Sequence, residues 1–125
     1  LGALIDSKTR VFMTAEAAAE TRPWFLSMFT LYSDTPFAPT SLEALQDPSS
    51  CDLNRGAVDD PLFLVNHFLG PVPAEDKADE ANVAAVLDDR VRRCADARGR
   101  VANVVAVDFV DHGDLVDVVE GLNGG

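Results

Sequence analysis

Basic residues are scarce in this chain, and long apolar runs are absent from it. Its 125 residues include 10 Lys and Arg against 21 Asp and Glu, which gives a net charge of -11 at pH 7. A protein of this charge repels the phosphate backbone of nucleic acids, so nucleic-acid binding is not expected. The longest apolar stretches fall short of the roughly 20 residues that cross a bilayer, so no transmembrane segment is expected either.

Cysteine and the common nucleotide and hydrolase motifs are also lacking. Two cysteines are too few for a disulfide-built mini-protein, and they do not form a CxxC pair. The chain has no GxGxxG, Walker, HExxH or GxSxG motif. Asp59 with Asp60 is typical of a loop, and Asp88 with Asp89 of a solvated helix face. We therefore expect neither a metal ion nor a cofactor.

What is present is the composition of one foldable domain, or part of one, with 47% hydrophobic residues. Short helical segments are predicted at 1–6, at 16–20 and after Pro23, and the Pro-rich segment 34–60 predicts a long loop. Helical spacing from Val83 to Cys94, closed by Gly99, predicts a helix, and a second apolar stripe predicts another over 115–122. Strands are predicted at 10–14, 29–33, 62–69 and 104–109. This alternation predicts an α/β fold with parallel strands.

Polar residues follow the predicted strands at the carboxyl ends, where α/β proteins place their catalytic groups. The last strand ends at Asp108, whose carboxylate needs either an imidazole partner or backbone amides from the turn at 111–113. Asp34 follows the second strand. Its side chain either belongs to a functional site there or caps the turn through its own backbone. Asn66 and His67 end the third strand, and a histidine in an apolar strand is more often a core residue than a catalyst.

Three runs taken in order resemble a known family. They are LYSDTPF at 31–37, CDLNRGAVDDPLFLVNHFL at 51–69 and NVVAVDFVDHGDLVDVVEGLNG at 103–124. Together they are similar to the carboxyl half of the phosphatidylinositol-specific phospholipase C X-domain-like phosphodiesterases of bacteria and fungi. The resemblance implies that residues 1–125 are half of a TIM-type (β/α)8 barrel, with strands corresponding to the fifth through eighth. The other half, with two catalytic histidines and an arginine, would precede Leu1.

The same resemblance implies a role for several residues. Asp108 would steady the basic histidine, as the aspartate of a catalytic triad does. Asp34 and Phe37 would contact the hydroxyls and ring of the sugar, and Asn66 and His67 would line the cleft. The substrate would be a phospholipid or a soluble phosphodiester. Because the histidines lie elsewhere, we expect the isolated chain to be inactive without its partner half.

Members with this pattern resemble secreted proteins, and in them Cys51 would pair with Cys94. The alternative is two free buried thiols. A rival interpretation of the whole chain is a non-catalytic acidic α/β binding module that completes its sheet by oligomerising. A third keeps the barrel but changes the substrate to a glycerophosphodiester or a sphingolipid.

Overall fold

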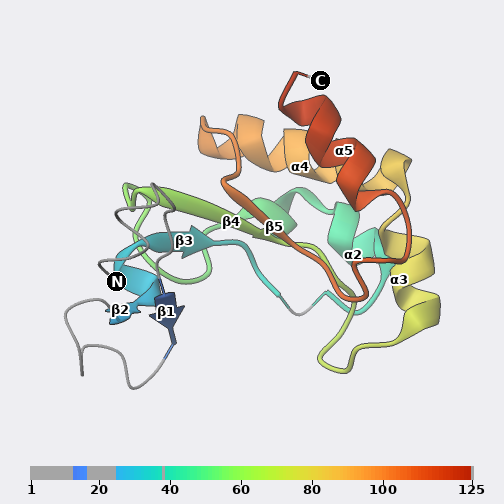
Figure 1. Ribbon diagram of the computed structural model, residues 1–125, viewed down its shortest axis with the longest axis horizontal. Coiled ribbons are helices and arrows are strands. Elements are labelled where there is room, and N and C mark those ends of the chain that lie inside the picture. Colours follow the sequence, from blue (N-terminus) through green and yellow to red (C-terminus); the bar gives the residue numbers. More distant parts are fainter. Residues whose placement is uncertain (1–12, 17–24, 38, 125) are drawn as a thin grey trace, which may run out of the picture.

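The computed structural model describes residues 13–16, 25–37 and 39–124 (Figure 1). Short strands and helices alternate along this part of the chain. In chain order they are β1 (Met13–Ala15), β2 (Phe25–Ser27), η1 (Met28–Thr30), β3 (Tyr32–Asp34), α2 (Leu42–Gln46), η2 (Pro48–Cys51), β4 (Leu62–Asn66), α3 (Glu75–Ala81), α4 (Ala84–Arg98), β5 (Val104–Ala106) and α5 (Leu115–Leu122), where η denotes a 3-10 helix.

The strands form two parallel sheets. β3, β4 and β5 make a three-stranded sheet with β4 in the centre, and β1 pairs with β2 in a sheet of two strands. The register aligns Asp34 with Leu64, and Leu64 in turn with Val104. All three strands of the larger sheet therefore end at one edge, and the helices α2 and α3 lie beyond that edge in Figure 1.

The main core lies between the larger sheet and the helices α4 and α5, which cover one of its faces (Figure 1). Phe63 and Val65 of β4 are fully buried there, because their side chains alternate to the helix-covered face. They pack with Leu87 and Val91 of α4 and with Val118 of α5. A smaller cluster around Leu45, Leu69 and Ala81 packs α2 against the start of α4.

The helix predicted from the Val83 to Cys94 spacing is confirmed as α4. It ends where Gly99 takes the left-handed conformation, at φ 65°, which a glycine adopts without steric cost. Asp88 and Asp89 lie on its solvated face, as predicted, and pair with arginines one turn later along the same helix.

Cys51 and Cys94 form a disulfide, so the predicted pairing is confirmed and the alternative of two free thiols is wrong. The bond joins η2 to α4, with the two Cα atoms 4.9 Å apart and both side chains buried. It therefore fixes the loop before β4 to the helix that covers β4.

The prediction of half a (β/α)8 barrel is wrong. In the part of the chain that the structure describes, strands form separate sheets of two and three strands with four α-helices, and neither sheet closes. In a barrel β2 and β3 would be parallel neighbours, and such neighbours need a crossover of a dozen residues or more. Only the residues 28–31, most of them in η1, separate these two strands. The chain is a small α/β domain.

Several local predictions also need correction. The helical turn predicted after Pro23 is replaced at Phe25–Ser27 by the strand β2, which pairs with β1. The long loop predicted at 34–60 contains α2 and η2, and α3 was not predicted at all. The predicted segment 1–6, most of the segment 16–20 and Pro23 itself lie outside the described residues.

None of the helices in the described segments is long and apolar enough to cross a membrane.

Candidate functional site

The polar residues singled out in the sequence lie along the carboxyl ends of the strands, but they differ in their position along the strand direction and in their burial. Asp34 is level with Val104 across the sheet, whereas Asp108 follows Val104 by four positions (108 minus 104). Asp34 is completely buried and Asp108 is half-buried. The two acids therefore occupy distinct environments at one edge of the sheet.

The carboxylate of Asp34 is saturated with hydrogen bonds. Its Oδ1 accepts from the backbone N–H of Arg55 at 2.8 Å and from Nδ2 of Asn54 at 3.2 Å. Its Oδ2 accepts from Nε and Nη2 of Arg55, at 2.8 and 2.5 Å, and from Nδ2 of Asn66 at 3.1 Å. Since a carboxylate offers about four lone-pair positions, contact with a sugar hydroxyl stays a prediction that requires one of these bonds to break.

Arg55 was missed in the sequence, although it organises this end of the sheet. Its guanidinium lies 4.2 Å from the ring centroid of Phe29 and 4.5 Å from that of Phe37. Its Nη1 donates to Oε1 of Glu16, just after β1, at 3.0 Å. Partial burial lowers the pKa of Arg55, but the hydrogen bonds and charges of Asp34 and Glu16 outweigh burial and raise the pKa overall. The side chain is a permanent cation.

The loop that carries Arg55 is held against β3 by a glycine. Gly56 has φ 78°, and a Cβ there would lie 2.1 Å from the carbonyl oxygen of Tyr32. Just before Gly56, two backbone hydrogen bonds join this loop to the end of β3. The N–H of Asp34 donates to the Arg55 carbonyl, and the N–H of Asn54 donates to the Asp34 carbonyl. The sequence signal for this site was the arginine-glycine pair, inside a segment treated as one loop.

Asn66 connects β4 to the end of β3. Its Nδ2 donates to the carbonyl of Thr35 at 2.7 Å as well as to Asp34, and its backbone N–H donates to Oγ1 of Thr35 at 2.9 Å. Its side chain is only 6% exposed. A place in an open cleft stays a prediction for Asn66, whose amide already has partners within the protein.

His67 lies in the interior. Its Nε2 is 2.8 Å from the carbonyl oxygen of Ala81, and its Nδ1 has no hydrogen-bond partner among the described residues. Burial, with a smaller contribution from the charge of Arg90, lowers its pKa to about 4. His67 is therefore neutral at pH 7, and its contact with substrate stays a prediction.

Arg90, which sequence analysis also missed, is a fully buried cation. It donates from Nη2 to the Ser50 carbonyl at 3.0 Å, from Nε to the Ser50 hydroxyl at 3.3 Å, and from Nη1 to the Asn66 carbonyl. Burial, followed by the charge of Arg93, lowers its pKa to about 10. It holds the carboxyl end of β4 against η2, next to the disulfide.

Asp108 sits in a loop that is fixed by its backbone. Nδ2 of Asn82 donates to the carbonyls of Asp108 and His112, at 2.9 and 3.1 Å. Phe109, which follows Asp108, is the one non-glycine residue of the described segments with positive φ, at 50°. The carboxylate of Asp108 makes no hydrogen bond or ion pair with a described residue, so the alternative in which it accepts amides from the turn at 111–113 is not observed.

His112, in the same loop, forms a surface pair with an acid. Its Nδ1 lies 2.8 Å from Oδ1 of Asp79 on α3. The hydrogen bond to Asp79 is the main cause of a raised pKa for His112. This imidazole is therefore already paired with a carboxylate other than Asp108.

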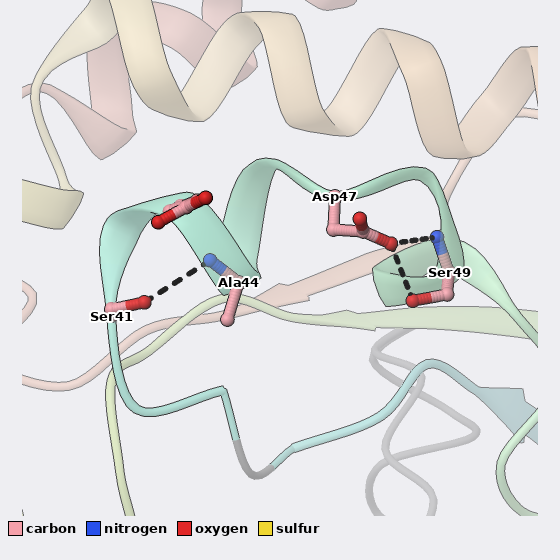
Figure 2. Close-up of a pocket in the computed structure, with 5 residues that line it drawn as sticks. Ser41, Ala44, Asp47 and Ser49 are labelled. Atoms are coloured by element: carbon pink, nitrogen blue, oxygen red, sulfur yellow. Dashed lines mark hydrogen bonds between the residues drawn. The ribbon is translucent and has the colours of Figure 1, made fainter.

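A shallow pocket of about 350 Å³ opens beside α2 and η2, but its polar groups serve as helix caps (Figure 2). The Ser41 hydroxyl accepts the Ala44 N–H at 3.2 Å, and Oδ1 of Asp47 accepts the N–H and hydroxyl of Ser49 at 2.9 and 2.6 Å. In the described segments, no group of three or more His, Cys, Asp or Glu side chains is arranged to hold a metal ion.

Comparison with known proteins decides the family. The PI-PLC X family model matches residues 1–123 of the chain. The chain belongs to the PI-PLC X family. A relative of this PI-PLC X chain is PI-PLC X domain-containing protein 1 of Arthroderma benhamiae, which is 30% identical over 97% of the chain. The chain spans 43% of that relative's length. No solved structure gave a significant match to this PI-PLC X chain.

Proposed function

We propose that this chain is part of a phosphoric diester hydrolase that cleaves an inositol phospholipid, or a related phosphodiester, as a phospholipase C does. Membership in the PI-PLC X family supports this function. Because the chain covers 43% of its fungal relative, the proposal concerns the larger protein that contains it. The contribution of this chain is a supporting carboxylate and part of the substrate cleft.

The environment of Asp108 is the observation that carries the proposal. Its backbone is held by Asn82, while its half-buried carboxylate is left without a partner in the described segments. Such an acid is suited to accept the Nδ1–H of an imidazole, which fixes the tautomer and stabilises the imidazolium. His67 is bonded inside the core and His112 is bonded to Asp79. The chain has two histidines in all, so the imidazole would come from outside these 125 residues.

The reaction that follows is a proton-transfer sequence. An imidazole steadied by Asp108 takes the proton of the hydroxyl next to the phosphate, and the hydroxyl oxygen bonds to phosphorus. The bond from phosphorus to the glycerol oxygen breaks, and a second imidazole protonates that oxygen. The products are diacylglycerol and a cyclic phosphodiester. The negative charge of Asp108 lowers the barrier by stabilising the imidazolium that forms.

Secretion is the proposed location. The disulfide Cys51–Cys94 is compatible with an oxidising compartment, where such bonds persist. Its burial would protect it from exchange with small thiols.

The proposed role of Asp108 is tested by Asp108→Asn in the complete natural protein. We expect kcat for phosphatidylinositol hydrolysis to fall by about 10²-fold or more, because the amide favours the wrong imidazole tautomer. The control is Asp111→Asn, which removes the same charge from an exposed position of the same loop and should leave kcat unchanged. Wild-type kcat in Asp108→Asn would contradict the role of Asp108, whereas an inactive wild-type protein would contradict the function itself.

A further inference from the structure

Two aromatic rings and a buried acid surround the guanidinium of Arg55. The guanidinium carbon Cζ of Arg55 lies over the rings of Phe29 and Phe37, at 4.2 and 4.5 Å from their centroids. Asp34 occupies the edge formed by Nε and Nη2. The edge formed by Nη1 and Nη2 is the one that Asp34 leaves to a ligand.

The edge formed by Nη1 and Nη2 has donors that Asp34 does not use. A guanidinium has five N–H donors, and hydrogen bonds to side chains occupy one on Nε, one on Nη2 and one on Nη1. One N–H on each terminal nitrogen is left. When Glu16 is displaced from Nη1, the edge presents two parallel N–H groups, which match the two oxygens of a carboxylate or a phosphoryl group.

The two acids bound to Arg55 are held very differently. The Asp34 side chain is 0% exposed and has three further donors, so its pairing with Arg55 is a fixed part of the interior. The Glu16 side chain is 62% exposed, and its bond to Nη1 of Arg55 is an ordinary surface ion pair. Exposed pairs of this kind contribute at most about 1 kcal/mol, so an incoming anion can displace Glu16.

We propose that Arg55 forms an oxyanion-binding subsite for a phosphoryl group of the substrate, and that Glu16 fills this subsite until the substrate displaces it. This cation is distinct from the arginine that the family resemblance places before Leu1. The phosphoryl group belongs either to a soluble inositol phosphate or to a lipid headgroup. Only this identification of the ligand as substrate rests on the proposed function, because oxyanion binding itself requires no hydrolysis.

Phe37 gives the subsite a second property. Its ring packs on the guanidinium, and the residue as a whole is 42% exposed. A ligand whose phosphoryl group binds the open edge of Arg55 therefore lies beside an apolar surface suited to the C–H face of a sugar ring. A phosphorylated ring should bind more tightly than inorganic phosphate alone.

The test is calorimetric titration of the full 125-residue chain with inorganic phosphate and with myo-inositol 1-phosphate. Glu16→Gln removes the competing carboxylate without touching Arg55 or the buried Asp34. We expect it to raise the affinity for both probes by about two- to five-fold, the equivalent of one exposed ion pair. Unchanged or lower affinity would overturn the proposal, and so would the absence of binding in both the wild type and Glu16→Gln.

The matched control is Asp88→Asn. It removes the same charge and frees Arg92, a surface arginine that is 59% exposed. This substitution should leave both affinities unchanged. An equal rise in Asp88→Asn would show that net charge alone governs binding, which would overturn the subsite. Arg55→Lys keeps the charge but loses the planar fork, and in a folded variant it should lower the affinity at least five-fold.

Vesicles distinguish the two sources of the phosphoryl group. Co-sedimentation with phosphatidylinositol vesicles, but not with phosphatidylcholine vesicles, that increases in Glu16→Gln supports a lipid headgroup. Tighter binding of myo-inositol 1-phosphate without vesicle binding supports a soluble ligand. Phosphate binding that persists when the complete protein fails to hydrolyse any phosphodiester would remove the proposed function and leave the subsite standing.

Discussion

At the scale of single residues, the domain keeps two charged groups in its interior by different means. Asp34 is neutralised by Arg55, whereas Arg90 contacts no carboxylate among the described residues and donates to carbonyl and hydroxyl oxygens instead. A buried ion is tolerated only when such partners replace its lost hydration. The carbonyls of Ser50 and Asn66 must therefore stay in place, and the disulfide at the neighbouring Cys51 helps to keep them there.

His67 should make stability depend on pH. Its pKa is about 4 in the folded protein against 6.5 ordinarily, so folding favours the neutral ring. Its contribution is complete above about pH 6.5 and is lost as the pH falls toward 4. In urea unfolding, the free-energy difference between the wild type and His67→Gln should shrink by about 3 kcal/mol from pH 7 to pH 4. A difference that does not change with pH would contradict the buried neutral histidine.

His112 provides a control of opposite sign. The hydrogen bond to Asp79 raises its pKa, so folding favours the charged ring. Its contribution is present at low pH and is lost as the pH rises through the pKa of the folded state. The difference between the wild type and His112→Gln should therefore grow, rather than shrink, as the pH is lowered.

At the scale of elements, the loop after β5 is the most tightly defined connection near the candidate site. Phe109 has φ 50° and Gly113 has φ 84°. The backbone of Gly113 packs so closely on Asn82 that a Cβ would lie 2.5 Å from its carbonyl oxygen. Since Asn82 also holds the carbonyl of Asp108, the position of that acid depends on this contact.

Two glycines of similar conformation test this dependence. Gly99 has φ 65° with nothing within 4 Å of an added Cβ, so Gly99→Ala should cost only the left-handed strain, about 1 kcal/mol. Gly113→Ala should cost clearly more in urea unfolding, because Asn82 must also move. In the complete protein, Gly113→Ala should in addition lower kcat through Asp108. Equal unfolding costs for the two variants would contradict the tight contact at Gly113.

The elements differ in how far the sequence could predict them. β4, α4 and α5 carry apolar patterns with the right period, and each was predicted close to its observed bounds. α3 was missed because the run EDKADEA has no large apolar side chain, and its buried positions are Ala78 and Ala81. β2 was given as a helical turn, since its pairing with β1 is a tertiary contact that local spacing does not reveal.

At the scale of the whole molecule, the sequence predicted an α/β class, but its barrel architecture was wrong and the contacts of the candidate site were not predicted. Strand ends pointed correctly to Asp34 and Asp108 as polar tips, but the partner of Asp34 lies 21 residues away in a loop without periodicity. No periodic spacing in the sequence indicated a structural role for Arg55 or for the buried Arg90. The barrel prediction came from the family resemblance alone. The connection between β2 and β3 contradicts it, because the connection is too short to join two parallel neighbouring strands.

The isolated chain should lack phosphodiesterase turnover, because both of its histidines are already bonded within the protein. A chromogenic inositol phosphodiester is a suitable substrate for the measurement, with the complete natural protein as the positive control. The chain should stay below one-hundredth of that rate, on the scale of about 10²-fold or more that general acid–base catalysis contributes. Comparable turnover by the chain alone would contradict the division of roles between this segment and the rest of the protein.

The pairing of Asp34 with Arg55 also has an evolutionary consequence. Losing the arginine leaves an unpaired negative charge in the interior, and losing the aspartate removes the ion-pair partner that positions a cation over two aromatic rings. A substitution at either position is therefore selected against unless the other position changes as well. Descendant sequences should keep or abandon the two residues together, and a lineage that abandons them must rebuild the end of β3 around apolar side chains.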